Sequence, residues 1–163
     1  MKTFAQYVTE LFNQPFRFTG TNDAQRRPGY WPRSTESYHY TNTTDQLAVG
    51  FTPVTIDGEH WEVAFVRNGT TSLTGGGAAG SVFASVLDAV KRFVREHSPE
   101  VLSFSAAKSE LDARTLLLRS GTRVRLYHSM IKRFAPGMGY ELWSDPDRDP
   151  LAHKEDFILR RKR

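Results

Sequence analysis

The chain has 163 residues, with 22 lysines and arginines, 18 aspartates and glutamates, and no cysteine. This length fits one domain with a hydrophobic core of its own, and we expect residues 1–163 to form a single domain. The composition, 39% hydrophobic and 25% charged, excludes an intrinsically disordered chain. The lack of cysteine excludes a disulfide scaffold, a thiolate metal site and a cysteine nucleophile.

Charge and hydropathy also bear on the compartment and the partners. No apolar run approaches the ~20 residues that a membrane span needs, so no membrane partner is expected. Glu10 and its polar neighbours stand where a signal peptide would be continuously apolar, which favours the cytoplasm. The formal net charge is +4, but basic residues cluster only at 119–133 and at 160–163. Because a nucleic-acid binder normally gathers them on one face, nucleic acid is the least favoured partner.

Residues 1–45 are expected to form a helix and a long polar loop. The apolar residues of the first segment recur on one helical face, and they are Phe4, Tyr7, Val8, Leu11 and Phe12. Pro15 marks the end of this helix. Residues 19–42 contain two prolines, two glycines and few aliphatic side chains, which predicts a loop. Its aromatic residues fit two interpretations, a surface loop held by its rings or a wall of a substrate site.

Residues 46–163 are expected to form the core of the domain, which opens with strands. Residues 46–54 and 61–66 are rich in β-branched and aromatic side chains, and a turn sequence separates them. In the second of these strands, Glu62 lies on the face opposite the apolar residues. A further short extended segment is expected at 70–74.

The rest of the core combines helices with strands. Apolar side chains at helical spacing follow Ser81 for about four turns, and Pro99 closes this central helix. The remaining elements are expected as a strand at 101–106, one or two helices within 111–134, and strands at 140–143 and 157–160. This order predicts an α/β domain of the α+β type, with a mixed, mostly antiparallel central sheet flanked by helices.

A glycine-rich turn precedes the central helix. It reads Thr74-Gly75-Gly76-Gly77-Ala78-Ala79, and the free N–H groups at such a helix N-terminus can bind phosphate. A nucleotide P-loop is excluded because no Gly-Lys-Ser/Thr sequence closes the turn. Gly75, Gly77 and Gly80 also spell the dinucleotide-binding pattern G-x-G-x-x-G. That interpretation is disfavoured because a predicted antiparallel hairpin precedes the turn and no acidic residue ends the next strand.

A third interpretation is an acyl-coenzyme A turn, since the chain from about residue 46 onward resembles the GNAT N-acetyltransferases. The motif of that family, Arg/Gln-x-x-Gly-x-Gly/Ala, follows antiparallel strands and opens the central helix. Residues 74–79 match it except at the first position, where Thr74 replaces arginine or glutamine. The second signature of the family is a strand, a helix with a tyrosine, and a Gly-aromatic step. Residues 101–106, Tyr127 and Gly139-Tyr140 resemble that signature.

The resemblance implies acetyl-CoA as the cofactor and an amine or a protein as the acceptor. It assigns cofactor binding to the turn and to a helix position that is often asparagine in the family: Thr74, Gly75, Gly76, Gly77, Ala78, Ala79 and Ser120. The cofactor would lie where two parallel strands separate, expected at 70–74 and 101–105. Tyr127 would protonate the departing thiolate, and Glu62 is the nearest acidic residue for a general base.

Alternatives remain open for these roles. Tyr127 also fits a core aromatic on an amphipathic helix, and Glu62 also fits a solvent-facing strand residue. The chain further resembles small GNAT-like proteins of tailed phages, which implies the host cytoplasm and a host protein as the acceptor. Thr74, together with the lack of any acidic residue between Val63 and Ala79, favours a second function. That function is a non-catalytic phage protein that binds a host or virion protein. The five histidines lack metal-ligand spacing, so no metal is expected.

Overall fold

The computed structural model describes residues 3, 14–68, 79–105, 131–144 and 156–163. The strands in these ranges are β1 (Arg17–Thr21), β2 (Glu36–Thr41), β3 (Gln46–Pro53), β4 (His60–Arg67), β5 (Val101–Ser105), β6 (Tyr140–Ser144) and β7 (Asp156–Arg161). The helical parts are α2 (Ala79–His97), residues 131–134 and the short 3₁₀ helix η2 (Pro136–Met138). The seven strands form one sheet in the order β1-β2-β3-β4-β5-β7-β6.

The sheet is mixed, which confirms the predicted class of fold. β4 and β5 pair in parallel, whereas β1 with β2, β2 with β3, β5 with β7, and β6 with β7 pair in the antiparallel sense. The chain forms two compact units, the first from Met1–Phe51 and Phe65–Ser98, the second from Thr52–Ala64 and Pro99–Arg163. The strands predicted within residues 46–66, at 101–106, at 140–143 and at 157–160 are all present.

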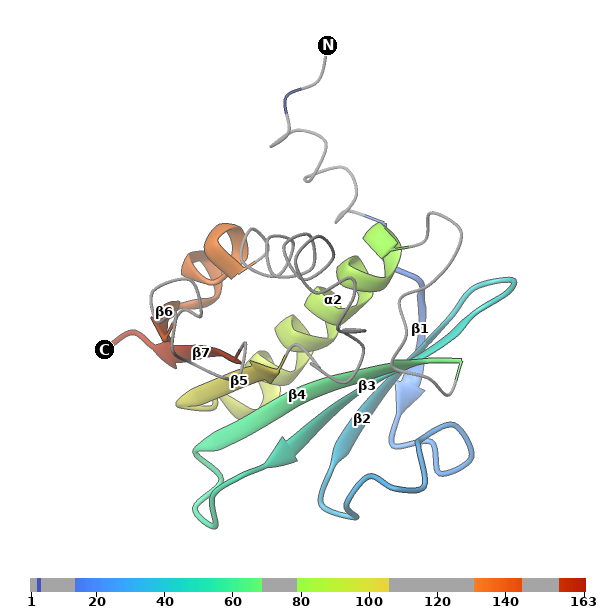
Figure 1. Cartoon of the computed structure of the whole chain (residues 1–163), viewed down its shortest axis with the longest axis horizontal. Helices are drawn as coiled ribbons and strands as arrows, with labels where there is room; N and C mark the ends of the chain where they lie inside the picture. The colour runs from blue at the N-terminus through green and yellow to red at the C-terminus, as the bar shows by residue number, and fades with distance from the viewer. Residues whose placement is uncertain (1–2, 4–13, 69–78, 106–130, 145–155) are drawn as a thin grey trace, which may run out of the picture. The chain divides into compact units, whose positions relative to one another are not determined.

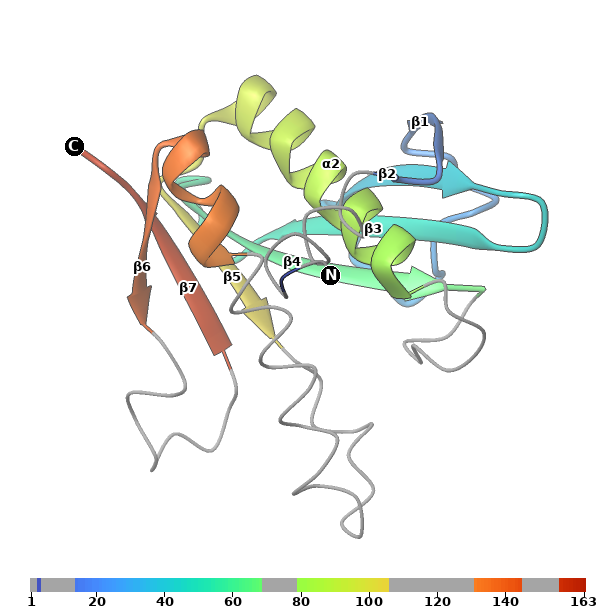
Figure 2. The same ribbon diagram turned by 90° about the horizontal axis from the view of Figure 1, so that it is seen from above.

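In the first unit, α2 lies across one face of the strands that precede it (Figure 1 and Figure 2). Its buried apolar residues recur at helical spacing, as predicted, and they are Val82, Phe83, Val86, Leu87, Val90 and Phe93. Phe93 stacks on Phe51 of β3 with ring centroids 4.1 Å apart. Tyr38 of β2 meets Phe51 edge-on at 5.4 Å. This aromatic cluster joins the helix to the sheet, because such rings bury large apolar areas in defined geometries.

Two tyrosine hydroxyls also link β2 to α2. The Tyr40 hydroxyl donates to Asp88 Oδ2 at 2.7 Å, and the Tyr38 hydroxyl donates to Glu96 Oε2 at 3.0 Å. Burial, more than the hydrogen bonds to the carboxylates, raises the pKa of both hydroxyls above the ordinary value of 10.0. Both groups therefore stay protonated donors at neutral pH. Arg92 holds Asp88 from the other side, with Nε 2.8 Å from Oδ2.

Replacing Tyr40 with phenylalanine tests the contribution of one such link. The ring stays in the core, but the hydrogen bond to the charged Asp88 is lost, so the free energy of unfolding should fall by about 1.5 kcal/mol. Urea denaturation of both proteins measures the difference. Tyr30→Phe is the matched control because the Tyr30 side chain is 70% exposed, and it should leave stability unchanged. Equal stability of wild type and Tyr40→Phe would contradict this account of the link.

The prediction of a loop over residues 19–42 is wrong at both ends of this range, because β1 and β2 lie there. β2 lacks the alternation of apolar and polar residues by which a strand is predicted, because both of its faces are buried. Its aromatic side chains pack on α2, while Ser37 and His39 lie under residues 22–35. Trp31 of that segment covers Gly50 of β3 so closely that a Cβ on Gly50 would lie 2.7 Å from the indole ring. Glycine is therefore required for this close approach.

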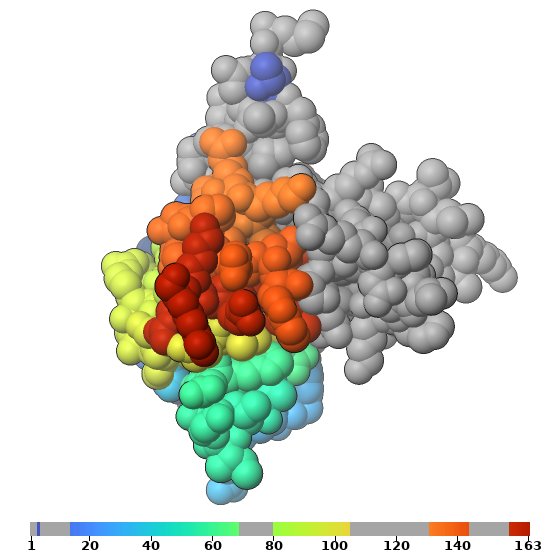
Figure 3. Space-filling model, turned by 90° about the vertical axis from the view of Figure 1, so that its left-hand side faces the viewer, coloured from blue at the N-terminus to red at the C-terminus, as the bar shows by residue number. Residues whose placement is uncertain are grey.

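In the second unit, β5 is the central strand. It pairs in parallel with β4 from His60↔Val101 to Val63↔Phe104, and on its other side with β7. β6 and β7 lie side by side at the surface, as Figure 3 shows in orange and red. The Tyr140 hydroxyl donates to the Pro99 carbonyl within the core, and burial raises its pKa to about 12.

Several predicted elements lie outside the described residues. These are the helix at 4–12, the extended segment at 70–74 and the helical residues before 131. Residues 131–134 are helical, and Ile131 is buried, as expected for the end of the predicted helix. In the part of the chain that the structure describes, the parallel neighbour of β5 is β4. Among the described residues, no helix is long and apolar enough to cross a membrane.

Candidate functional site

The start of α2 is the described part of the predicted cofactor turn. Ala79 is the first residue of the helix. The other assigned residues, Thr74, Gly75, Gly76, Gly77, Ala78, Ser120 and Tyr127, lie outside the described residues. The first turn of α2 carries no acidic side chain, and the last turn carries Arg95 and His97. The first turn of this 19-residue helix therefore contributes no negative charge of its own that would repel a phosphate.

A cavity of about 700 Å³ adjoins this helix start. Polar and apolar groups both line it, and the lining residues are Gln14, Pro15, Phe16, Arg17, Thr41, Asn42, Thr43 and Ser81. Arg17 supplies a guanidinium, which binds oxyanions by paired N–H donors. Ser85 connects one wall to the helix, since its hydroxyl donates to the Ser81 carbonyl at 2.7 Å and accepts from the Phe16 N–H at 2.8 Å. The cavity can therefore receive a polar, negatively charged group.

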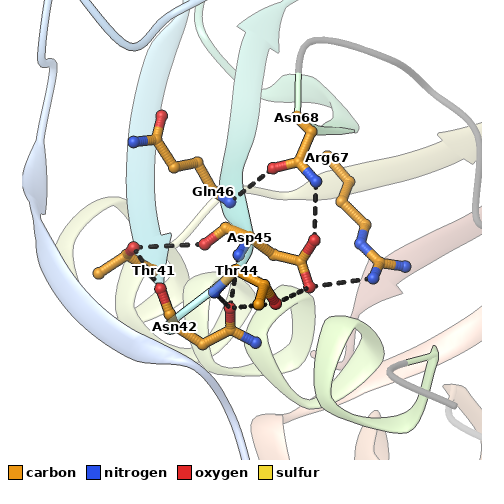
Figure 4. A network of polar contacts seen from close by, with 7 residues as sticks. All are labelled: Thr41, Asn42, Thr44, Asp45, Gln46, Arg67 and Asn68. Carbon is orange, nitrogen blue, oxygen red and sulfur yellow. Dashed lines mark hydrogen bonds and ion pairs between the residues drawn. The ribbon is translucent and has the colours of Figure 1, made fainter. Parts of the chain in front are cut away.

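The β2–β3 turn, which forms another wall, is held by a network centred on Asp45 (Figure 4). Asn42 Oδ1 accepts from the backbone N–H groups of Thr44 and Asp45, at 2.8 and 2.6 Å. The Asp45 carboxylate then accepts from Arg67 Nη2 at 3.0 Å and from Asn68 Nδ2 at 2.7 Å. The network thus joins the turn to the end of β4.

Asp45 and Arg67 form a buried ion pair, with side chains only 10% and 9% exposed. The hydrogen bonds from Arg67 and Asn68 hold the pKa of Asp45 below its ordinary value of 3.8. The side-chain oxygen of Asn68 also accepts from the backbone N–H of Gln46 at 2.8 Å, and the Asn68 backbone has a positive φ of 51°. These bonds hold Asn68, the last described residue before 69–78, to the β2–β3 turn within the first unit.

Glu62, the predicted general base, is exposed on β4 and is paired in register with Ser103 of β5. It belongs to the second unit, whereas Ala79 belongs to the first. Its neighbour His60, the nearest imidazole to the turn, lies 2.9 Å from the Ser103 hydroxyl through Nε2. Neither residue is among those that line the cavity at the start of α2. The role of Glu62 as a base stays a prediction.

His39 is buried below the segment that covers the sheet. Its Nε2 lies 2.9 Å from the Ser37 hydroxyl and accepts from the Asp23 N–H at 3.2 Å. Burial lowers its pKa from the ordinary value of 6.5, so the ring is neutral at pH 7, as this acceptor role requires. His39 lines a second, smaller cavity of about 350 Å³ together with Arg26 and Arg27. Its hydrogen bonds hold residues 22–35 on the sheet.

Sequence reasoning missed Arg17 and the Asp45 network. Local signals for part of the network were present: Asn42 and Asp45 occupy a turn-forming sequence, and Asn68-Gly69 is a turn dipeptide. No local signal pairs Asp45 with Arg67, because Asp45 lies in the β2–β3 turn and Arg67 ends β4, and the two meet only when the sheet forms.

Comparisons of the chain with protein-family models, curated proteins and solved structures find no match. The function is therefore inferred from the residues of this chain.

Proposed function

We propose that the chain is a GNAT-like N-acyltransferase that uses acetyl-CoA to acylate an amine acceptor. One observation carries the proposal: β4 leads through the glycine-rich segment into α2, and α2 returns the chain to β5, which is parallel to β4. The GNAT resemblance implies this arrangement of a parallel strand pair and a turn at the start of the central helix. Antiparallel strands precede it, as that resemblance also requires.

The register of the parallel pair supports the same proposal. β4 and β5 are paired over four residues of each strand, ending at Val63↔Phe104, while β4 continues to Arg67. A cofactor site where two parallel strands separate needs such a limit to their pairing.

The start of α2 fits a phosphate-bearing acyl donor. It has no acidic side chain in its first turn, and Arg17 is among the residues that line the adjoining cavity. Backbone N–H groups of Gly75 to Ala79 would bind the pyrophosphate, since glycine side chains leave the backbone open to close approach. The donor supplies an acyl group on a thioester, which is the bond to be broken.

Acyl transfer would then require two proton transfers, one to the departing thiolate and one from the amine. The acceptor nitrogen forms a bond to the thioester carbonyl carbon, and the carbon–sulfur bond breaks. Tyr127 would give its phenolic proton to the departing thiolate, while the proton of the amine passes to Glu62 or to water. The largest contribution would come from holding amine and thioester together, because orientation lowers the barrier without any strong acid or base.

A second candidate is a non-catalytic GNAT-like protein that binds a host or virion protein, as the phage resemblance implies. Thr74 at the first motif position favours it, and so does the exposed position of Glu62. Under the first candidate the acceptor would be an amine of a host protein. The two candidates differ in whether acetyl-CoA binds.

Titration calorimetry with acetyl-CoA tests the proposal on wild type and Gly77→Glu. The glutamate adds bulk and negative charge where the pyrophosphate is expected, so affinity should fall at least about tenfold, or 1.4 kcal/mol. Gly137→Glu is the matched control, because a side chain at Gly137 meets open space in an exposed turn.

Unchanged affinity in Gly77→Glu would exclude the turn from the site. Equal losses in both glycine variants would show a general charge effect and would also exclude it. No binding of acetyl-CoA by wild type would overturn the acyltransferase proposal in favour of the binding protein. Circular dichroism of each variant verifies that the fold is retained.

A further inference from the structure

The beginning of β2 and the end of α2 bring three potential metal ligands together. Glu36 is the first residue of β2, and Glu96 and His97 are the last two residues of α2. One ligand atom from each residue lies within 4.8 Å of the other two. His97 Nε2 lies 2.7 Å from Glu36 Oε2 and 3.8 Å from Glu96 Oε2. A single imidazole nitrogen therefore faces two carboxylates.

These separations are close to those of a tetrahedral metal site. Zinc bonds to nitrogen and carboxylate oxygen are about 2.1 Å long, which sets neighbouring ligand atoms about 3.4 Å apart. The Glu36–His97 distance would lengthen and the Glu96–His97 distance would shorten, each by less than about 1 Å. Because the side chains of Glu36 and His97 are about one third exposed, such adjustments need no movement of the core.

Neighbouring groups orient two of the three ligands. The Tyr38 hydroxyl donates to Glu96 Oε2 at 3.0 Å, and the His97 ring stacks on Phe93 at 4.4 Å. Tyr38 and Phe93 are themselves buried. Hydrogen bonds of this kind to a ligating carboxylate fix its direction and strengthen metal binding. The set is therefore held from the core side and open on the solvent side.

We propose that Glu36, Glu96 and His97 bind a divalent transition-metal ion, with zinc as the best fit. Two carboxylates beside one imidazole carry more negative charge than a protonated histidine neutralises, and a dication balances it. Imidazole with carboxylate favours zinc and its neighbours over magnesium or calcium, which prefer oxygen ligands alone. The ion joins the start of β2 to the end of α2 and stabilises the first unit. This site is independent of the acyl-donor site.

Cobalt titration of the metal-free full chain tests the proposal directly. Co²⁺ in a site with nitrogen and oxygen ligands gives visible absorption bands, and we expect one equivalent to bind and Zn²⁺ to displace it. His97→Gln and Glu36→Gln should each weaken Co²⁺ binding roughly tenfold or more while the fold is retained. His60→Gln is the matched control, because it removes another part-buried imidazole outside the set and should bind Co²⁺ as wild type does.

Thermal unfolding provides a second readout. Added Zn²⁺ should raise the melting temperature of wild type and of His60→Gln, because a ligand that binds only the folded state stabilises it. It should not raise that of His97→Gln. Absence of the cobalt bands in wild type would overturn the proposal. Equal cobalt affinity in wild type and the two ligand variants would also overturn it, and would leave Glu36 and His97 as an ion pair only.

Discussion

Asp45→Asn is expected to lower the free energy of unfolding by about 3 kcal/mol. The asparagine keeps the shape of the side chain, but Arg67 would then remain buried without the carboxylate that balances its charge. The hydrogen bond from Asn68 would also be weakened. Urea denaturation at neutral pH measures the loss. Glu59→Gln makes the same chemical change at an exposed carboxylate and should leave stability nearly unchanged.

The stability difference between wild type and Asp45→Asn should depend on pH, because it depends on the charge of the Asp45 carboxylate. Its pKa is lowered in the folded chain, so its contribution is complete above the unfolded value of 3.8 and is lost as the pH falls through the lower folded value. The difference between wild type and Asp45→Asn should therefore narrow at pH 3. Arg67→Met should lower the free energy of unfolding less in the Asp45→Asn variant than in wild type. Strict additivity of the two changes would contradict the coupling of Asp45 and Arg67.

Tyr127→Phe should slow the chemical step by roughly 10–1,000-fold if the chain catalyses acyl transfer. The ring keeps its volume and only the proton donor to the thiolate is removed, so affinity for acetyl-CoA should change little. Single-turnover kinetics with saturating acetyl-CoA and an amine acceptor measure the step. Full turnover in a stable variant would exclude Tyr127 as an essential acid.

Melting temperatures measured beside the rates separate catalysis from structure. A hydroxyl that faces the site leaves stability unchanged when it is removed, whereas a buried one costs about 1–3 kcal/mol. Tyr140→Phe is the structural control, because the Tyr140 hydroxyl donates to the Pro99 carbonyl in the core. It should lower stability and leave the rate unchanged. A Tyr127→Phe variant that behaves like this control would assign Tyr127 to the core.

The elements that were predicted correctly each show a hydrophobic periodicity within their own sequence. The central helix buries one stripe of apolar side chains, so its period of 3.6 is visible in the sequence. In β4, Val63 is buried between the exposed Glu62 and Ala64, which is the alternation expected of a strand. β1 and β2 were missed because the polar residues of β2 are covered by residues 22–35, and no local pattern indicates such a cover.

The residues of the candidate sites also divide into those that the sequence could indicate and those that it could not. A phosphate-binding turn could be proposed from the sequence alone, because phosphate binding by a helix N-terminus uses contiguous backbone groups. Arg17 could not be predicted as a cavity residue, because its place depends on how β1 lies beside the start of α2. Gly50 likewise had no local reason to be glycine, and only the Trp31 ring above it supplies one.

The sequence by itself determined the mixed α+β class, most strands and the central helix. These depend on hydrophobic period and on turn residues, which act over a few neighbouring positions. Only the tertiary structure decided that Asp45 meets Arg67 and that Glu36 meets His97. Charged side chains on separate elements carry no periodic signal, and they become partners only when burial of the apolar faces brings their elements together.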